Sequence, residues 1–149
     1  MTCSTRLADQ LDVHWRTALR PRLDGLTDAE YFWEPVENCW TLHKDGSIDF
    51  AYPPPEPEPV TTISWRLAHV IVGVLAARNH SHFGGPEADY ESWAYATDAD
   101  TALKQLDEQY DAWNAGVRGL SDEQLWRPCG EAGFEDGTLN YLSIPAVET

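Results

Sequence analysis

Residues 63–77 read ISWRLAHVIVGVLAA, and apolar side chains occupy nearly every side of the helix that this composition predicts. A helix without a polar face has to be covered by protein on more than one side. The stretch is shorter than the roughly 20 apolar residues that a bilayer core requires, so its cover is protein rather than lipid. It therefore predicts the central helix of a helical bundle, spanning about 61–83.

Two further long helices are predicted, one before and one after the central helix. Over about 97–119, apolar residues step by four and three positions, which is typical of a packing seam, and Thr97 is the expected N-cap. Over about 4–22, apolar residues recur on a single face, and Gly25 follows as a stop signal. The chain is therefore expected to form one all-α domain over 1–149.

The connection over about 35–60 is expected to be irregular and rich in proline. Residues 40–50 alternate in hydrophobicity around a Lys-Asp-Gly-Ser turn, which predicts a small hairpin. The run PPPEPEP at 53–59 cannot form a helix or a central strand, because proline lacks the backbone N–H. Such a run can be a recognition motif for small modules, but it is more often a stiff connector, and we favour the connector.

The sequence also contains an internal echo. Residues 26–35 and 120–128 each begin with a leucine and a Thr or Ser that can cap a short helix, and each ends in Trp-x-Pro. Either capping signals simply recur, or the bundle consists of two similar halves. In the second half, glycines occupy the approach to a fourth helix and Pro145 interrupts it. Three long helices are then expected around a core suited to four, with the fourth truncated or altered.

Composition excludes several classes of function. Lys and Arg number 10 against 25 Asp and Glu, and the net charge of −15 would repel nucleic-acid phosphates and anionic lipids. The sequence shows neither a signal-peptide core nor a membrane span. The three cysteines, Cys3, Cys39 and Cys129, are far apart, which indicates reduced thiols. A cytoplasmic protein that binds neither nucleic acid nor membrane is expected.

The five histidines are the first candidates for chemistry. His69 lies inside the apolar helix, so it is either a core histidine satisfied by a hydrogen bond or a metal-binding or catalytic residue. His80 and His82 lie at the expected helix end, where a capping role is favoured. His14 and His43 are expected to be structural or solvated. No pair has the three- or four-residue spacing that lets two imidazoles on one helix share a metal ion.

Several segments resemble the DinB-like superfamily, most closely an actinobacterial-type branch of uncharacterised proteins. They are LTDAEYFWEP at 26–35, Cys39-Trp40, TTISWRLAH at 61–69 and ARNHSHFG at 77–84, of which the third is the most specific. The resemblance covers about residues 5–130. It implies an up-down-down-up four-helix bundle with a metal site that is typically formed by three histidines.

The resemblance also implies an activity and a cofactor. Relatives with known activity are isomerases and transferases that depend on low-molecular-weight thiols. Three neutral imidazoles would leave an open position on a divalent metal, Zn or Ni, at which such a thiol loses its proton. His69 matches the ligand on the second helix, whereas the His-x-x-x-His pair expected on the last long helix is missing from 139–149.

The missing His-x-x-x-His pair leaves His69 as the one assigned metal ligand. We interpret it as a truncation, a frameshift or a naturally shortened relative. An active site would need two further ligands, from a partner chain or from carboxylates such as Asp107 or Asp111.

Three hypotheses for function follow. The first is a metal-dependent DinB-like protein, related to thiol-dependent transferases and isomerases, that acts on a small-molecule substrate. The second is a non-catalytic helical interaction module that forms a homodimer through apolar bundle faces left uncovered. The third is a small-molecule sensor with a cavity lined by Trp15, Trp65 and Trp113.

Overall fold

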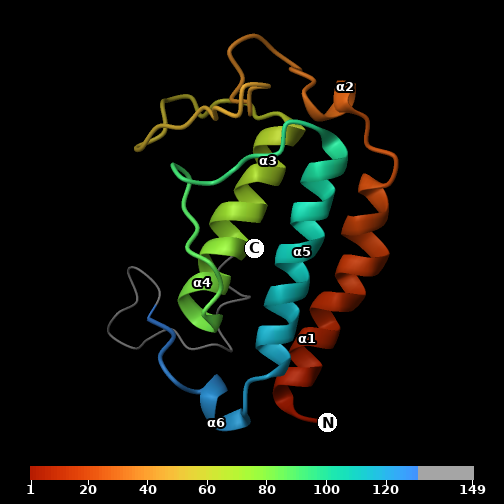
Figure 1. Ribbon diagram of the computed structural model, residues 1–149, viewed down its shortest axis with the longest axis vertical. Coiled ribbons are helices and arrows are strands. Elements are labelled where there is room, and N and C mark those ends of the chain that lie inside the picture. The colour runs from red at the N-terminus through yellow and green to blue at the C-terminus, as the bar shows by residue number, and fades with distance from the viewer. Residues whose placement is uncertain (131–149) are drawn as a thin grey trace. The chain divides into compact units, whose positions relative to one another are not determined.

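A computed structural model of the chain describes residues 1–130 (Figure 1). These residues form helices joined by loops, and the backbone bridges among them are isolated pairs rather than strands. The prediction of an all-α fold is confirmed. None of the helices in this part of the chain is long and apolar enough to cross a bilayer. The described residues divide into two compact units, 1–19 with 114–130, and Arg20–Trp113, and the single domain over 1–149 stays a prediction.

The first unit contains α1 (Cys3–His14), which continues into the π-helical turn η1 (Trp15–Leu19). The short helix α6 (Asp122–Leu125) is attached to the start of α1. The attachment is a hydrogen bond from the Cys3 amide to the Asp122 carboxylate, at 3.2 Å. The first unit therefore combines α1, from the start of the sequence, with α6, from a late part of it.

The second unit begins with the 3-10 turn η2 (Arg20–Leu23), which ends the first long helix close to the predicted residue 22. The short helix α2 (Asp28–Tyr31) follows. Thr27 begins α2 with a capping box, and Ser121 begins α6 with another. The two segments of the internal echo therefore share a local structure as well as a sequence pattern.

The central helix runs without a break as α3 (Ile63–His69), the π-helical segment η3 (Val70–Ala76) and α4 (Ala77–Phe83). It begins after the N-cap Thr62, slightly later than the predicted residue 61. It ends at Gly84, whose φ of +69° lies in the left-handed region that glycine adopts without strain.

The long helix α5 (Ala99–Arg118) lies within the predicted range of 97–119. Its N-cap is Asp98, whose carboxylate accepts the Thr101 amide at 2.7 Å and the Thr101 hydroxyl at 2.8 Å. The predicted cap at Thr97 is therefore wrong. An N-cap side chain bonds to an amide two or three residues ahead, and the backbone enters the helix one residue later than the pattern indicated.

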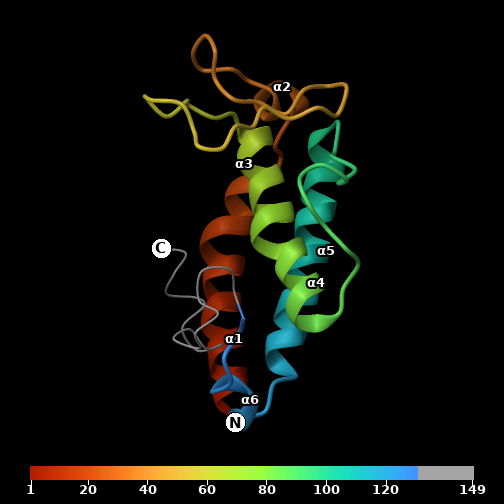
Figure 2. The ribbon, with the colours of Figure 1, turned by 90° about the vertical axis from the view of Figure 1, so that its left-hand side faces the viewer.

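Within the second unit, the central helix and α5 lie side by side and run parallel (Figure 1). Asn79 donates from Nδ2 to the Gln109 carbonyl at 2.9 Å. One turn further along both helices, Phe83 packs on Trp113 with ring centroids 5.2 Å apart. Because the contacts advance in the same direction on both helices, residues 84–98 have to return along the central helix, as Figure 2 shows. A parallel pair is what the down-down middle of the implied bundle requires.

One face of the central helix is fully buried, and the opposite face is only partly covered. The buried face consists of Ser64, Leu67, Ala68, Ile71, Val72, Leu75, Ala76 and Asn79. On the other side, Gly73 and Val74 are half-buried and His69 is exposed. The expectation of cover on more than one side is thus met in part, where the 84–98 segment crosses the helix.

Candidate functional site

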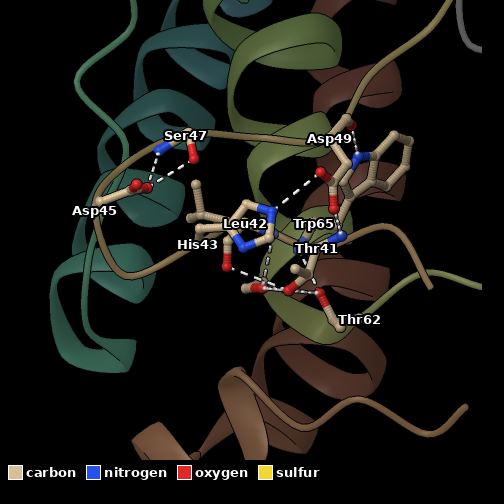
Figure 3. Close-up of polar contacts among 9 residues, drawn as sticks. Thr41, Leu42, His43, Asp45, Ser47, Asp49, Thr62 and Trp65 are labelled. Atoms are coloured by element: carbon tan, nitrogen blue, oxygen red, sulfur yellow. Dashed lines mark hydrogen bonds and ion pairs between the residues drawn. The ribbon is translucent and has the colours of Figure 1, made fainter. Parts of the chain in front are cut away.

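Residues 40–50 form the small hairpin that the sequence predicted (Figure 3). Leu42 and Ile48 make an antiparallel bridge. The His43 amide donates to the Ser47 carbonyl at 2.7 Å and so closes the turn. The prediction of a hairpin inside the irregular connection is confirmed.

Buried hydroxyl groups attach this hairpin to the start of α3. Thr62 Oγ1 donates to Thr41 Oγ1 at 3.0 Å and lies 2.8 Å from Ser64 Oγ. The three residues Thr41, Thr62 and Ser64 have exposed fractions of 4%, 1% and 0%. Breaking one of these hydrogen bonds would leave a buried hydroxyl unpaired, which costs its full desolvation free energy. The N-cap of the central helix is therefore also part of the hairpin's attachment.

Asp49 is the second attachment, and it binds through its side chain and its backbone (Figure 3). Its carboxylate accepts the Thr41 amide at 3.0 Å and the His43 Nε2 group at 3.0 Å. Its backbone carbonyl accepts the indole N–H of Trp65 at 2.7 Å. The hydrogen bond to Asp49 raises the pKa of His43 above its ordinary value. His43, which was expected to be structural or solvated, has a structural role.

Five aromatic rings from the hairpin, the central helix and the crossover meet here, and we call them the aromatic cluster: Trp40, Phe50, Trp65, His69 and Tyr90. Trp65 and His69, about one turn apart on α3, stack with centroids 5.4 Å apart. Phe50 stacks on Tyr90 at 5.4 Å. Trp40 contacts Phe50 at 6.4 Å and Trp65 at 5.8 Å. Each ring contacts two others, so the cluster packs the three segments together.

His69 is exposed, and a hydrogen bond fixes the position of its ring. Its Nδ1 lies 2.5 Å from the Tyr90 hydroxyl, and the planes of the two rings differ by 11°. Partial burial, followed by the charges of Arg66 and Arg78, lowers the pKa of His69, so the ring is neutral at pH 7. The expectation of a core histidine is wrong, because the crossover covers only part of this helix face. The functional alternative remains.

The Tyr90 hydroxyl can donate or accept, so either neutral tautomer of His69 satisfies it. When Nδ1 carries the proton, Nε2 presents a lone pair. When the Tyr90 hydroxyl donates to Nδ1, Nε2 presents an N–H group. In both cases Nε2 is the ring nitrogen left for a ligand, since no side chain within residues 1–130 bonds to it.

Tyr90 reaches His69 because Gly73 has no side chain. A Cβ atom on Gly73 would lie 2.8 Å from Tyr90 Cζ and closer still to the hydroxyl oxygen. Non-bonded carbon atoms need about 3.5–4.0 Å, so any other residue would displace the tyrosine. A glycine in the middle of a helix lowers its stability, and here it provides the space that the site requires.

A pocket of about 330 Å³, which we call the aromatic pocket, lies beside the cluster. It is lined by Trp40, Phe50, Ala51, Tyr52, Pro54, Glu58, Pro59, Thr61, Trp65, Arg66 and His69. Aromatic, aliphatic and proline residues form most of this lining, and Glu58, Thr61, Arg66 and His69 add a substantial polar share. Thr61 Oγ1 is buried and has no hydrogen-bond partner in the described part of the chain. The pocket has the size and composition of a site for a small organic molecule.

Residues 1–130 contain no group of three His, Cys, Asp or Glu side chains that could hold a metal ion. Asp107, a suggested additional ligand, is held by Arg20, whose Nε donates to its two oxygens at 2.8 and 3.1 Å. Asp111, the other suggested ligand, is exposed on α5. The expectations about a His-x-x-x-His pair and a fourth helix concern 131–149, which lie outside the described residues. The described part of the chain thus brings His69 alone to the site.

The predicted cavity lined by Trp15, Trp65 and Trp113 is wrong. Trp65 packs on Trp40 near the start of the central helix, whereas Trp113 packs on Phe83 at its other end. The apolar pattern of each helix indicated correctly that both residues face neighbouring elements, but it could not show that they contact different ones. Trp15 belongs to the first unit.

Of the two histidines expected to cap the end of α4, the structure supports that role for His80. His80 Nδ1 lies 2.8 Å from the Gly85 carbonyl, which agrees with a capping role at the end of α4. His82 packs its ring on Trp113, with centroids 6.4 Å apart. His14 is exposed.

Sequence reasoning missed three members of the aromatic cluster. Trp40 and Phe50 could have been found, because both flank the predicted hairpin. Tyr90 gave no signal, since its contact with His69 joins residues 21 positions apart through an irregular crossover.

The fold and the site define a helical protein with one histidine held at the edge of a small aromatic pocket. The DinB superfamily matches residues 10–147, which is most of the chain, so the chain belongs to the DinB superfamily. The resemblance seen in the sequence is confirmed at this level. No curated protein and no solved structure matches the chain.

Replacing Gly73 with Ala should destabilise the protein by about 1–3 kcal/mol, because the new methyl group overlaps Tyr90. An unhindered helix position would instead gain up to about 1 kcal/mol from this change. Urea denaturation of Gly73→Ala, Tyr90→Ala and the double variant forms a double-mutant cycle. We expect the double variant to lose much less than the sum of the single losses, whereas additive losses would contradict the contact.

The His43–Asp49 pair should make the hairpin sensitive to pH. Since the folded pKa of His43 is raised, the pair stabilises the fold below the unfolded value of about 6.5 and ceases to do so as pH rises through the folded value. The effect on stability is small, because both side chains are partly exposed. NMR titration should show that Asp49→Asn lowers the pKa of His43 and that Asp45→Asn lowers it less. Equal effects of the two variants would contradict the assignment.

Proposed function

We propose that this member of the DinB superfamily binds a small organic molecule in the aromatic pocket, with His69 as the polar residue that orients it. The observation that carries the proposal is the bond between His69 Nδ1 and the Tyr90 hydroxyl. This bond fixes the imidazole at the edge of the pocket and leaves Nε2 for a ligand. An imidazole with a fixed position is preorganised for binding, which lowers the entropy lost when a ligand docks.

The composition of the pocket supports the same function. Sites for small molecules are mostly apolar, with a few placed polar groups that fix orientation. Trp40, Phe50 and Trp65 supply apolar surface, and His69 supplies a polar group.

A divalent metal, Zn or Ni, together with a low-molecular-weight thiol is the second candidate, and it rests on the family resemblance. A metal-bound histidine usually makes a hydrogen bond through its other ring nitrogen, as His69 does with Tyr90. The donor set of residues 1–130 does not fit a complete metal site, because it supplies His69 alone. Further ligands would have to come from outside this range or from a second copy of the chain.

A homodimer, as the interaction-module hypothesis predicted, is favoured by apolar side chains beside α2. Trp33 is 63% exposed, Val36 48% and Ile63 37%. Trp33 and Ile63 also line a groove of about 540 Å³. Exposed apolar surface of this kind is typical of protein contacts. This surface differs from the bundle face that the hypothesis invoked.

We also propose that the protein is cytoplasmic. Cys3, Cys39 and Cys129 are free thiols, which suits a reducing compartment such as the cytoplasm. The net charge of −15 opposes nucleic acid or an anionic membrane as a partner.

Three probes with the same ring and different charge test the proposed binding: benzoate, benzamide and benzyltrimethylammonium. We expect at least one to bind the full chain and to shift the NMR signals of Trp65 and Tyr90. His69→Ala should weaken that probe about tenfold, the value of one hydrogen bond that orients a ligand. His14→Ala, a change at an exposed histidine of the first unit, is the matched control and should have no effect. Failure of all three probes to shift these signals would overturn the proposal.

Metal analysis of purified wild-type protein and of His69→Ala separates the two candidates. Metal-dependent function predicts a stoichiometric divalent ion in the wild type that is lost in His69→Ala. Small-molecule binding without a metal predicts none in either protein. A stoichiometric ion that persists in His69→Ala would show that His69 is not its ligand.

A further inference from the structure

We infer that the ligand of the aromatic pocket is a planar organic carboxylate, with its carboxylate on the Arg66 guanidinium and its ring against the aromatic walls. The inference rests on the proposed function and names the chemical class of its ligand. Arg66 and His69 are about one turn apart on α3, and both line the pocket. They are the two polar residues that the central helix contributes to the lining, and the hairpin and the proline-rich connection contribute aromatic and proline residues together with Glu58.

In the described part of the chain, Arg66 is a cation without an acidic partner. Its side chain is exposed, and it forms no ion pair with a carboxylate of residues 1–130. Within residues 1–130, Arg6 and Arg22 form no such pair either, but of these three arginines only Arg66 lines the aromatic pocket. Arginines that do form such pairs are Arg16, Arg20, Arg118 and Arg127. A guanidinium binds a carboxylate through two parallel hydrogen bonds, which also fixes the plane of the ligand.

His69 adds a second donor to the lining of the pocket. When the Tyr90 hydroxyl donates to Nδ1, the neutral ring carries its proton on Nε2 and can donate it to a ligand oxygen. A carboxylate bound to Arg66 and to this N–H group would select one of the two tautomers that Tyr90 permits. The imidazole needs no positive charge for this role.

The other walls select a flat and apolar body. Trp40, Phe50 and Trp65 offer aromatic surface, and Pro54 and Pro59 extend it. Planar rings gain from stacked or edge-on contact with such side chains beyond the area they bury. The volume of about 330 Å³ lies at the small end of the range for ligand pockets, so we expect one ring with small substituents.

Aromatic walls can also attract a cation, and Glu58 lies in the same pocket. Two observations favour the anion. The rings of the cluster contact one another at centroid distances of 5.4–6.4 Å, so no open cage for a quaternary ammonium group lies between them. In addition, Glu58 is on an exposed loop, whereas Arg66 is carried by a helix.

The same three probes test the inference on the full chain. Benzoate should bind at least about tenfold more tightly than benzamide, and benzyltrimethylammonium should bind most weakly. Arg66→Gln should lower benzoate affinity about tenfold and leave benzamide affinity unchanged. Arg22→Gln, at an exposed arginine that does not line this pocket, is the matched control and should change neither. Glu58→Gln should tighten benzoate about twofold, because it removes a repelling charge.

The outcomes separate this inference from the function on which it rests. If benzamide or benzyltrimethylammonium binds as tightly as benzoate, or if Arg66→Gln retains full benzoate affinity, the inference is overturned and the pocket remains a binding site. If no probe shifts the signals of Trp65, both are overturned. Should Arg66→Gln fail to fold, the salt dependence of the wild type decides: benzoate binding should weaken as salt rises, and affinity independent of salt would overturn the inference.

Discussion

The contact of Tyr90 with Gly73 and His69 is the interaction on which the site depends. Its origin is topological, because two parallel helices require a connection that returns along their length, and residues 84–98 follow that route (Figure 2). Gly73 leaves space for the tyrosine ring, and His69 provides its hydrogen-bond partner. A polar residue of an apolar helix is thereby held at the surface in one orientation, with its second nitrogen open to a ligand.

The hairpin supplies the facing wall, and its attachment to the helix is polar. Thr41, Thr62 and Ser64 form a buried hydroxyl cluster, and Asp49 accepts the indole N–H of Trp65. Directional bonds of this kind specify a single register, whereas apolar contacts alone tolerate sliding. The aromatic cluster then packs against a hairpin whose position these hydrogen bonds determine.

The helices were predictable because local periodicity and capping chemistry determine them, and the observed helix bounds lie close to 61–83 and 97–119. His69 was identified as a candidate because it is a polar residue within an apolar run. Its exposure was not predictable, since the sequence does not show which helix face an irregular crossover covers. The partnership with Tyr90 was missed for the same reason. The error at Thr97 has another cause: a Thr and an Asp are adjacent there, and only the backbone conformation decides which of them caps the helix.

The walls of the pocket come from two segments that differ in how well they tolerate substitution. Trp65, Arg66 and His69 are carried by a helix whose opposite face is packed, whereas Pro54 and Glu58 belong to a loop that is exposed throughout 51–58. Substitutions in such a loop disturb little packing and cost little stability. Under the proposed function, the selectivity of the pocket can diverge through substitutions in this one surface stretch while the helical scaffold is retained.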